Sequence, residues 1–235
     1  MNLKQTLTVL TIAAGLTLSV STASAEGKPV GITSTLSEIS VMHNGKPTKI
    51  TRNQNNDNVV NPAFAKTSRP CPPFCIQPMN LGENIETIGE VEVIDYADKM
   101  SKGDANIMLV DSRTPDWVAK GTIPGAVNVS WVELTPSKGA TTEGIMKVMA
   151  NQFGVKVADG KDVVDVDEAI ANGDTSGIFD FSGAKTLVMF CNGMWCGQSP
   201  ASIAALRKFG YPADRIKYYR GGMQDWEILG LSTAK

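Results

Sequence analysis

Two cysteines, Cys191 and Cys196, lie five positions apart in the stretch "KTLVMFCNGMWCGQSP". The apolar residues before Cys191 are typical of a strand that is buried on both faces. Ser199 and Pro200 are typical of the N-cap and the first residue of a helix. Because open α/β sheets bind ligands at the carboxyl ends of their strands, this position makes Cys191 a candidate nucleophile.

The loop after Cys191 is expected to surround its sulfur with backbone N–H groups. Such a cradle at the positive end of a helix stabilises a thiolate, and it also stabilises an anionic adduct such as a persulfide or a bound oxyanion. No His, Lys or Arg lies within residues 191–199, so activation must come from backbone dipoles or from residues distant in sequence. The other interpretation of Cys191 is a buried, inert thiol. The predicted active-site loop consists of Asn192, Gly193, Met194, Trp195, Cys196, Gly197, Gln198 and Ser199.

The remaining cysteines have several interpretations. Cys196 could resolve an adduct on Cys191, form a disulfide with it, bind a metal or act as a second nucleophile. Cys71 and Cys75 lie in "RPCPPFCIQPM", which predicts a rigid extended loop. They could form a local disulfide, or they could lie beside the active-site loop, exchange disulfides there or complete a four-thiolate metal site. We favour the disulfide because no histidine or zinc-knuckle glycine flanks the pair, and we expect no metal and no cofactor.

Two arginines, Arg113 and Arg220, are candidate anion-binding residues. Asp111 and Arg113 are more typical of a structural ion pair near a strand end, whereas Arg220 could lie at the carboxyl edge of the sheet. His43 is the only histidine, and we expect it on the surface of a strand. Trp226 is expected in the core.

The first 25 residues are typical of a cleaved export signal. Lys4 supplies the positive start, "LTVLTIAAGLTLSV" the apolar part, and Ala23-Ser24-Ala25 the small-residue cleavage pattern. The apolar part is shorter than the roughly 20 residues that a membrane span needs. We therefore expect cleavage after Ala25 and an exported protein, which would be periplasmic in a Gram-negative cell.

The composition argues against some classes of partner. The formal net charge is −2 and no cluster of Lys and Arg is present, so nothing favours nucleic-acid binding. After the signal, no segment is apolar for long enough to span a membrane. The length suits one sizeable domain with an appendage.

Residues 26–84 are predicted to form this appendage, packed on the main domain. The stretch "ISVMHNGKPTKIT" has two alternating runs about Asn44-Gly45, which is a strong hairpin signal. A polar run and the proline-rich loop follow. Such a segment has too few large apolar side chains to build a core of its own.

Residues 85–235 alternate strand and helix patterns. This order predicts an α/β domain with a central parallel five-stranded sheet and helices on both faces. The expected strands are 91–94, 107–110, 126–129, 186–190 and 216–219. The expected helices are 96–100, 115–119, 143–152, 166–171, 200–209 and 223–229. The long connection 131–184 is expected to hold two extra helices and a loop.

This domain resembles the rhodanese-like superfamily in three ordered motifs. The stretch "IMLVDSRTPDWVAKGTIPGAVNV" looks like the early signature of the family, with Thr122 where His is usual. The stretch "LVMFCNGMWCGQSPASIAALRKFGY" is similar to its strand, active-site loop and helix. The stretch "IKYYRGGMQDWEILGL" resembles its closing signature, with Gly221, Gly222 and Trp226 in place.

The resemblance implies a sulfurtransferase in which Cys191 carries sulfane sulfur as a persulfide. The donor would be a small sulfur-containing anion such as thiosulfate, or a persulfide, and the acceptor would be a thiol on a small molecule or a protein. The loop departs from the common pattern, because Ser199 lies eight positions after Cys191 and Gln198 stands where an Arg is expected. Without that charge, phosphoryl transfer would lose much of its transition-state stabilisation, and thiosulfate would be held less tightly.

Two other classes of function stay open at this point. The first is a non-catalytic thiol module that binds a soft metal such as Cu(I). The second is a thiol–disulfide exchange protein that uses Cys191 and Cys196. In the sulfurtransferase interpretation, Cys196 would capture sulfur from Cys191 or protect it as a disulfide.

Overall fold

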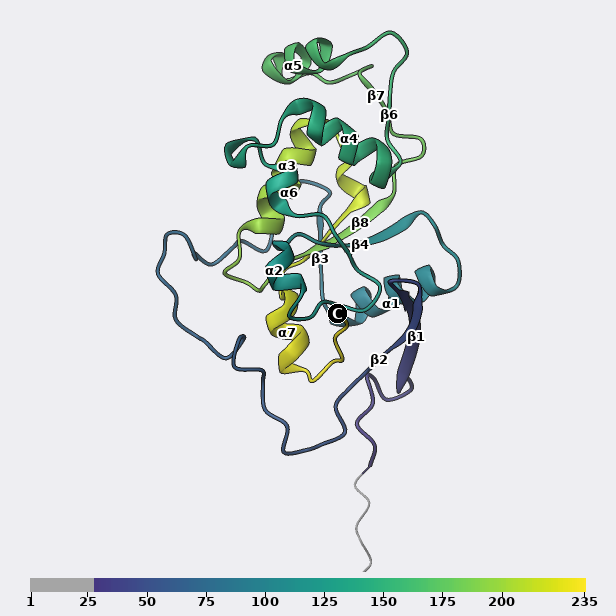
Figure 1. Cartoon of the computed structure of the whole chain (residues 1–235), viewed down its shortest axis with the longest axis vertical. Helices are drawn as coiled ribbons and strands as arrows, with labels where there is room; N and C mark the ends of the chain where they lie inside the picture. Colours follow the sequence, from purple (N-terminus) through teal and green to yellow (C-terminus); the bar gives the residue numbers. More distant parts are fainter. Residues whose placement is uncertain (1–27) are drawn as a thin grey trace, which may run out of the picture.

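The computed structural model describes residues 28–235, so the predicted signal segment lies outside the described residues. Its centre is a sheet of five parallel strands in the order β3-β9-β8-β4-β5. These strands are β3 (Glu86–Ile88), β4 (Ile107–Asp111), β5 (Val127–Asn128), β8 (Thr186–Phe190) and β9 (Ile216–Tyr219). Helices cover both faces of the sheet (Figure 1), which confirms the predicted α/β fold. In this described part, every helix is too short or too polar to span a bilayer.

Strand β8 lies in the middle of the sheet and ends where the two-cysteine loop begins. Its Phe190 pairs with Asp111 of β4 and with Tyr219 of β9. The residues from Leu187 to Phe190 are all buried, as expected for a strand that is covered on both faces. Cys191 therefore emerges at the carboxyl edge of the sheet, as predicted.

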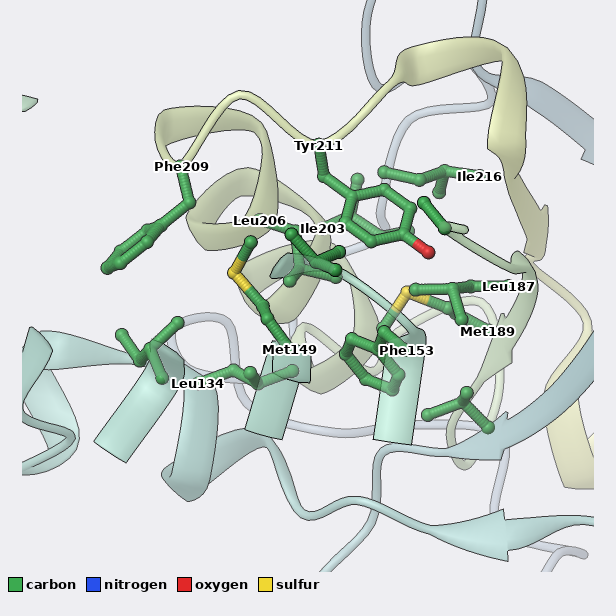
Figure 2. Close-up of a cluster of buried hydrophobic side chains, with 14 of the residues drawn as sticks. Leu134, Met149, Phe153, Leu187, Met189, Ile203, Leu206, Phe209, Tyr211 and Ile216 are labelled. Carbon is green, nitrogen blue, oxygen red and sulfur yellow. The ribbon is translucent and has the colours of Figure 1, made fainter. Parts of the chain in front are cut away.

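One face of the sheet carries the larger apolar core. The helices on this face are α3 (Trp131–Leu134), α4 (Thr142–Phe153) and α6 (Gln198–Lys208). Figure 2 shows side chains of α4, α6 and β8 in this core, including Met149, Phe153, Leu206, Leu187 and Met189. Because each buried side chain of this size contributes about 1.5 to 3 kcal/mol, the packing fixes β8 and the start of α6 relative to each other.

The opposite face is covered by two helices and by the predicted hairpin. These elements are α1 (Glu90–Ser101), α7 (Gly222–Ile228), β1 (Glu38–His43) and β2 (Lys46–Thr51). Ile39 and Ile50 of the hairpin share one buried cluster with Ile94 of α1 and Trp226 of α7. Figure 1 shows the hairpin beside α1. The hairpin thus contributes to the core of the main domain, and Trp226 lies in the core as predicted.

The strand predicted at residues 91–94 is wrong, because these residues belong to α1 and β3 precedes them. The letters "VEVI" alternate, which favours a strand, but Val93 and Ala97 lie on one buried face at helical spacing. The side chain of Glu92 also accepts the backbone N–H of Gly89 and caps the helix. The helical period and the cap together outweigh the local β-propensity.

The other predicted helices are present with small changes at their ends. The long connection after β5 holds α3 and the two expected extra helices, α4 and α5. It also contains a short antiparallel pair of strands that was not expected. The remaining elements are α2 (Pro115–Val118), α5 (Val163–Asn172), β6 (Lys156–Val157), β7 (Phe179–Asp180) and the 3-10 helices η1 (Pro136–Lys138) and η2 (Ala213–Arg215).

His43 is buried, so its predicted place on a strand surface is wrong. Alternation along β1 puts Ile39, Val41 and His43 on the same buried face. The Nδ1 atom of His43 accepts the backbone N–H of Gly125 at 3.2 Å. Burial lowers the pKa of His43, because the charged imidazolium is poorly solvated there. The residue therefore joins the hairpin to the main domain as a neutral acceptor.

Asp111 and Arg113 form a buried ion pair. Nη2 of Arg113 lies 2.6 Å from Oδ2 of Asp111, and both side chains are 0% exposed. Arg113 also donates to the carbonyl oxygen of Gly121, and the hydroxyl of Thr122 donates to Asp111. The prediction of Arg113 as an anion-binding residue is therefore corrected, because the guanidinium is sealed from solvent and its charge is already compensated.

We predict that Asp111→Asn lowers the free energy of unfolding by about 3 to 5 kcal/mol, because it leaves a charged guanidinium buried without its partner. The measurement is urea denaturation. Glu143→Gln is the control, because Glu143 forms an exposed pair with Lys147 and such pairs contribute little. Equal denaturation midpoints for the two variants would contradict the role of the buried pair.

Candidate functional site

The sulfur of Cys191 lies within the cysteine loop, residues 191–199, which follows β8 and includes the first two residues of α6. The residue is 2% exposed and its thiol is not part of a disulfide. The hydroxyl of Ser199 donates to Sγ of Cys191 at 3.2 Å, and the Cys191 thiol donates to the carbonyl oxygen of Cys196 at 3.2 Å. Residues of the predicted loop thus enclose the sulfur.

Hydrogen bonds lower the pKa of Cys191 to about 7 in spite of its burial. Burial is the largest single effect, and it raises the pKa because it disfavours the thiolate. It is outweighed by hydrogen bonds from the Cys196 thiol, the Ser199 hydroxyl and the backbone N–H groups of Ser199 and Gly193. A substantial part of this thiol is therefore ionised at neutral pH, although the loop contains no positively charged side chain.

Ser199 is not the N-cap of α6, so that prediction is corrected. The helix begins at Gln198, directly after Gly197, and Ser199 lies in its first turn. Pro200 is tolerated there because the N–H groups of a first helical turn have no partner within the helix. The hydroxyl of Ser199 contacts Cys191 instead of capping the helix.

Cys196 differs from Cys191 in its chemistry. It is also free and nearly buried, with 4% exposure. A hydrogen bond to Cys191 and, after it, burial raise the pKa of Cys196. Its backbone N–H donates to the carbonyl oxygen of Gly193 at 2.8 Å, and this turn brings the two thiols together. Cys196 therefore stays protonated beside Cys191, and its thiol donates to Oε1 of Gln198 at 3.6 Å.

The start of α7 binds the cysteine loop through the main chain. The backbone N–H groups of Met223 and Gln224 donate to the carbonyl oxygens of Cys191 and Asn192 at 2.9 and 3.0 Å. Gly222 has a φ of +57°. A methyl group at this position would collide with the carbonyl oxygen of Cys191. This close approach of two backbones requires glycine.

The proline-rich loop, residues 69–79, also lies against the cysteine loop. The backbone N–H of Gln77 donates to the carbonyl oxygen of Met194 at 2.7 Å. Nε of Arg220 donates to the carbonyl oxygen of Gln77 at 2.9 Å. Figure 1 shows the segment between β2 and β3 as a long extended loop around the outside of the domain. The appendage thus reaches the candidate site as well as the core.

Trp195 connects these neighbouring segments. Its Nε1 donates to Oε1 of Gln224 at 2.8 Å. The guanidinium carbon of Arg69 lies 3.6 Å from the centre of the indole ring, and the ring of Phe74 meets the indole edge-on with centroids 5.7 Å apart. The indole ring is therefore held by α7 through Gln224 and by the proline-rich loop through Arg69 and Phe74.

Cys71 and Cys75 form a disulfide, which is the pairing that we favoured. Both sulfurs are used in this bond, so the four cysteines do not form the alternative four-thiolate site. Cys71 nevertheless lines a groove together with Met194 and Trp195. The disulfide therefore lies beside the cysteine loop. The pair thus forms a local disulfide and also lies next to the predicted active-site loop, which the sequence analysis treated as alternatives.

The groove beside Trp195 has a volume of about 740 Å³. The proline-rich loop, the cysteine loop and the segment after β9 form its walls. Arg220, the second predicted anion-binding residue, lies in this groove. The complete lining is Thr67, Ser68, Arg69, Cys71, Phe74, Ile76, Met194, Trp195, Arg220 and Gln224.

Four contacting residues were missed by the sequence reasoning: Arg69, Phe74, Gln77 and Gln224. Three of them lie in the proline-rich loop, whose cysteines were the only signal for its proximity. Nothing in a single sequence places that loop against a strand end far along the chain. Gln224 lies in the closing motif, where its polar side chain among apolar residues could have marked it.

The chain belongs to the rhodanese-like domain family. A comparison with known families matches the rhodanese-like domain over residues 93–229, more than half of the chain. The resemblance seen in the sequence motifs is therefore confirmed. A comparison with curated proteins finds no match.

Several solved structures are similar to this chain. A protein of unknown function from Rhodopseudomonas palustris, described as a possible tyrosine phosphatase, is 16% identical, with 66% of this chain and 88% of that chain covered and a TM-score of 0.39. The rhodanese-like domain of a protein from Anabaena sp. is 16% identical, with 65% and 80% covered and a TM-score of 0.33. A Bacillus halodurans protein is 16% identical, with 60% and 70% covered and a TM-score of 0.34. At such values these likenesses say nothing about activity.

We predict that the rate of alkylation of Cys191 by iodoacetamide titrates with a midpoint near its pKa of about 7. Only the thiolate reacts, so the rate rises about tenfold per pH unit below the midpoint and levels off above it. Ser199→Ala removes a donor to the thiolate and should move the midpoint upward, which slows the reaction at pH 6 roughly three- to tenfold. Peptide mass spectrometry of quenched samples measures the rate.

Ser202→Ala is the matched control for this experiment. Ser202 is buried in the same helix, and its hydroxyl has no hydrogen-bond partner in the described part of the chain. Its removal should leave the midpoint in place. An equal shift in both variants, or no shift in Ser199→Ala, would contradict a direct effect of the Ser199 hydroxyl on the thiolate.

Proposed function

We propose that this protein is a sulfurtransferase that carries sulfane sulfur as a persulfide on Cys191. Membership of the rhodanese-like family supports a sulfurtransferase-type or related activity. The observation that carries the assignment to Cys191 is a free thiol at the end of β8 with a pKa lowered to about 7. A partly ionised thiol at neutral pH is the nucleophile that sulfur transfer requires.

The proposed reaction has two displacement steps at sulfur. The Cys191 thiolate first attacks the sulfane sulfur of the donor. The bond between that sulfur and the rest of the donor breaks. The leaving group takes the electron pair, and it is sulfite for thiosulfate or a thiolate for an organic persulfide. An acceptor thiolate then attacks the outer sulfur of the Cys191 persulfide and releases the Cys191 thiolate. The sum is a transfer of one sulfur atom, and no further oxidant or reductant is consumed.

The groups that lower the pKa of Cys191 also suit the intermediate. A persulfide is anionic near neutral pH, and the backbone N–H groups of Gly193 and Ser199 point toward the Cys191 sulfur. Fixed donors around a developing negative charge need no rearrangement during the reaction. Because the loop contains no basic side chain, the stabilisation of the anionic sulfur depends on neutral donors.

Cys196 would regulate the fate of the persulfide. Attack of Cys196 on the outer sulfur moves the sulfane sulfur from Cys191 to Cys196. Attack on the inner sulfur forms a Cys191–Cys196 disulfide and releases hydrosulfide. The raised pKa of Cys196 makes both attacks slow at neutral pH, because only a thiolate attacks. Transfer to an external thiol is therefore favoured over the internal reaction.

We predict that the wild-type protein gains the mass of one sulfur atom after treatment with thiosulfate or polysulfide, and that Cys191→Ser does not. Cys196→Ser keeps a free Cys191 thiol and should still gain the sulfur. Intact-protein mass spectrometry measures the gain, before and after cyanide removes sulfane sulfur. A gain by Cys191→Ser together with none by Cys196→Ser would reverse the assignment of the nucleophile.

A thiol–disulfide exchange protein is the second candidate function. The closeness of the Cys196 and Cys191 thiols, each of which changes the pKa of the other, favours it, because these groups would become the two sulfurs of a disulfide. If the protein exchanges thiols and disulfides, Cys191 and Cys196 should form a reversible disulfide with a measurable reduction potential. Sulfur transfer to cyanide should then be negligible. Sulfur loading on Cys191 with cyanide-dependent turnover supports the first proposal instead.

We also propose that the protein is exported and that its signal is removed after Ala25. The Cys71–Cys75 disulfide supports an oxidising compartment. Expressed from the full sequence in a Gram-negative cell, the protein should occur in the periplasmic fraction with Glu26 at its N-terminus. N-terminal sequencing checks this result, and a double substitution of Ala23 and Ala25 by Leu should block cleavage. Full-length protein in the cytoplasmic fraction would contradict export.

A further inference from the structure

Arg69 and Arg220 line the groove beside Trp195, and neither forms an ion pair in the described part of the chain. A guanidinium binds carboxylates through the N–H groups in its plane. Two guanidinium groups in one groove, neither of them in an ion pair, favour an anionic ligand.

Arg69 is arranged to bind an anion with its edge. Its guanidinium carbon lies 3.6 Å from the centre of the Trp195 ring, so the flat face of the guanidinium is used in stacking. Stacking leaves the N–H groups at the edge free for a carboxylate. The Nε of Arg69 is buried and has no hydrogen-bond partner in the described chain. Because Nε has no access to the groove, the Nη groups are the donors of Arg69 that an anion would bind.

Arg220 is held in place and keeps part of its donors free. Its Nε donates to the carbonyl oxygen of Gln77, and no other hydrogen bond of this side chain occurs among residues 28–235. Burial and then Glu90 raise the pKa of Asp225, while Arg220 opposes them. Asp225 therefore interacts with the charge of Arg220 without forming an ion pair, and Arg69 is the less compensated of the two cations.

The rest of the groove is suited to an organic molecule. Phe74, Ile76, Met194 and Trp195 give it an apolar wall, and Ile76 is 80% exposed. Grooves of about 300 to 1,000 Å³ hold small organic ligands, and this groove has about 740 Å³. A small inorganic anion such as thiosulfate would fill only a fraction of this space and would leave the apolar wall in water.

We propose that this groove binds the organic partner of sulfur transfer, a thiol or persulfide that carries a carboxylate and an apolar body. The carboxylate binds Arg69 and Arg220, and the apolar body lies against the aromatic wall beside the cysteine loop. This inference rests on the proposed sulfurtransferase function. Arg69 lies outside the matched range 93–229, so the appendage supplies a charge that the cysteine loop lacks at Gln198.

The test compares two thioethers that differ in one carboxylate, 2-(methylthio)benzoate and thioanisole. Neither carries transferable sulfur, so binding is measured apart from any reaction. Ligand-observed NMR titration at constant ionic strength should show tighter binding of the carboxylate compound to the wild-type protein. Arg69→Gln and Arg220→Gln should each weaken it roughly tenfold or more, and thioanisole binding should change little.

Two variants serve as controls. Lys66→Gln removes a positive charge from an exposed residue of the same segment that does not line the groove, and it should bind like wild type. Arg69→Lys keeps the charge but loses the flat stacked geometry, and it should bind between wild type and Arg69→Gln. Equal binding of the two thioethers, or equal weakening by Lys66→Gln and Arg69→Gln, would overturn the proposal.

The outcome separates this inference from the proposed function. If Cys191 gains sulfur but Arg69→Gln binds the carboxylate probe as tightly as wild type, the groove proposal fails and the sulfurtransferase proposal stands. If the probe binds as expected but Cys191 gains no sulfur, the anion site stands as a binding property and the proposed reaction fails. Thermal unfolding of each variant shows that its fold is intact.

Discussion

The hydrogen bonds from the start of α7 to the carbonyl oxygens of Cys191 and Asn192 hold the cysteine loop at the end of β8. They are possible only because Gly222 lets the two backbones approach closely. The loop is also bound at Met194 by Gln77 of the proline-rich loop. The sulfur of Cys191 is therefore placed by main-chain contacts from segments that are far apart in sequence, and the packing of β8, α6 and α7 supports them.

The groups that lower the pKa of Cys191 and the guanidinium groups of the groove lie in different places. Neutral donors, among them the hydroxyl of Ser199 and the thiol of Cys196, favour the thiolate of Cys191. The guanidinium groups of Arg69 and Arg220 lie in the adjoining groove. A positive charge inside the loop would stabilise the thiolate further and lower its intrinsic nucleophilicity. The pKa of Cys191 therefore stays near neutrality, and under the proposal above the two guanidinium groups provide the charge for an anion.

Much of the sheet could be predicted from the sequence, because buried parallel strands are short apolar runs between turn residues. The strand before Cys191 is such a run. That residues 91–94 form a helix and not the predicted strand could not be inferred from these residues alone. Their alternation fits a strand, their apolar spacing also fits a helix, and the cap at Gly89 favours the helix. The position of Cys191 followed from its strand, whereas Arg69 reaches the site only through tertiary packing of a loop without periodicity.

The Cys71–Cys75 disulfide lies two residues from Arg69, in a loop that contacts the domain through hydrogen bonds of Gln77 and through the ring of Trp195. A chain that folds where thiols stay reduced would still build the sheet, the buried ion pair and the Cys191 loop, because none of these contains a disulfide. It would lose a covalent limit on the conformations of the segment that carries Arg69 and Phe74. Material prepared in a reducing cytoplasm would therefore keep the cysteine loop in place next to a groove of variable shape, and under the proposals above the redox history of a sample would set its apparent selectivity.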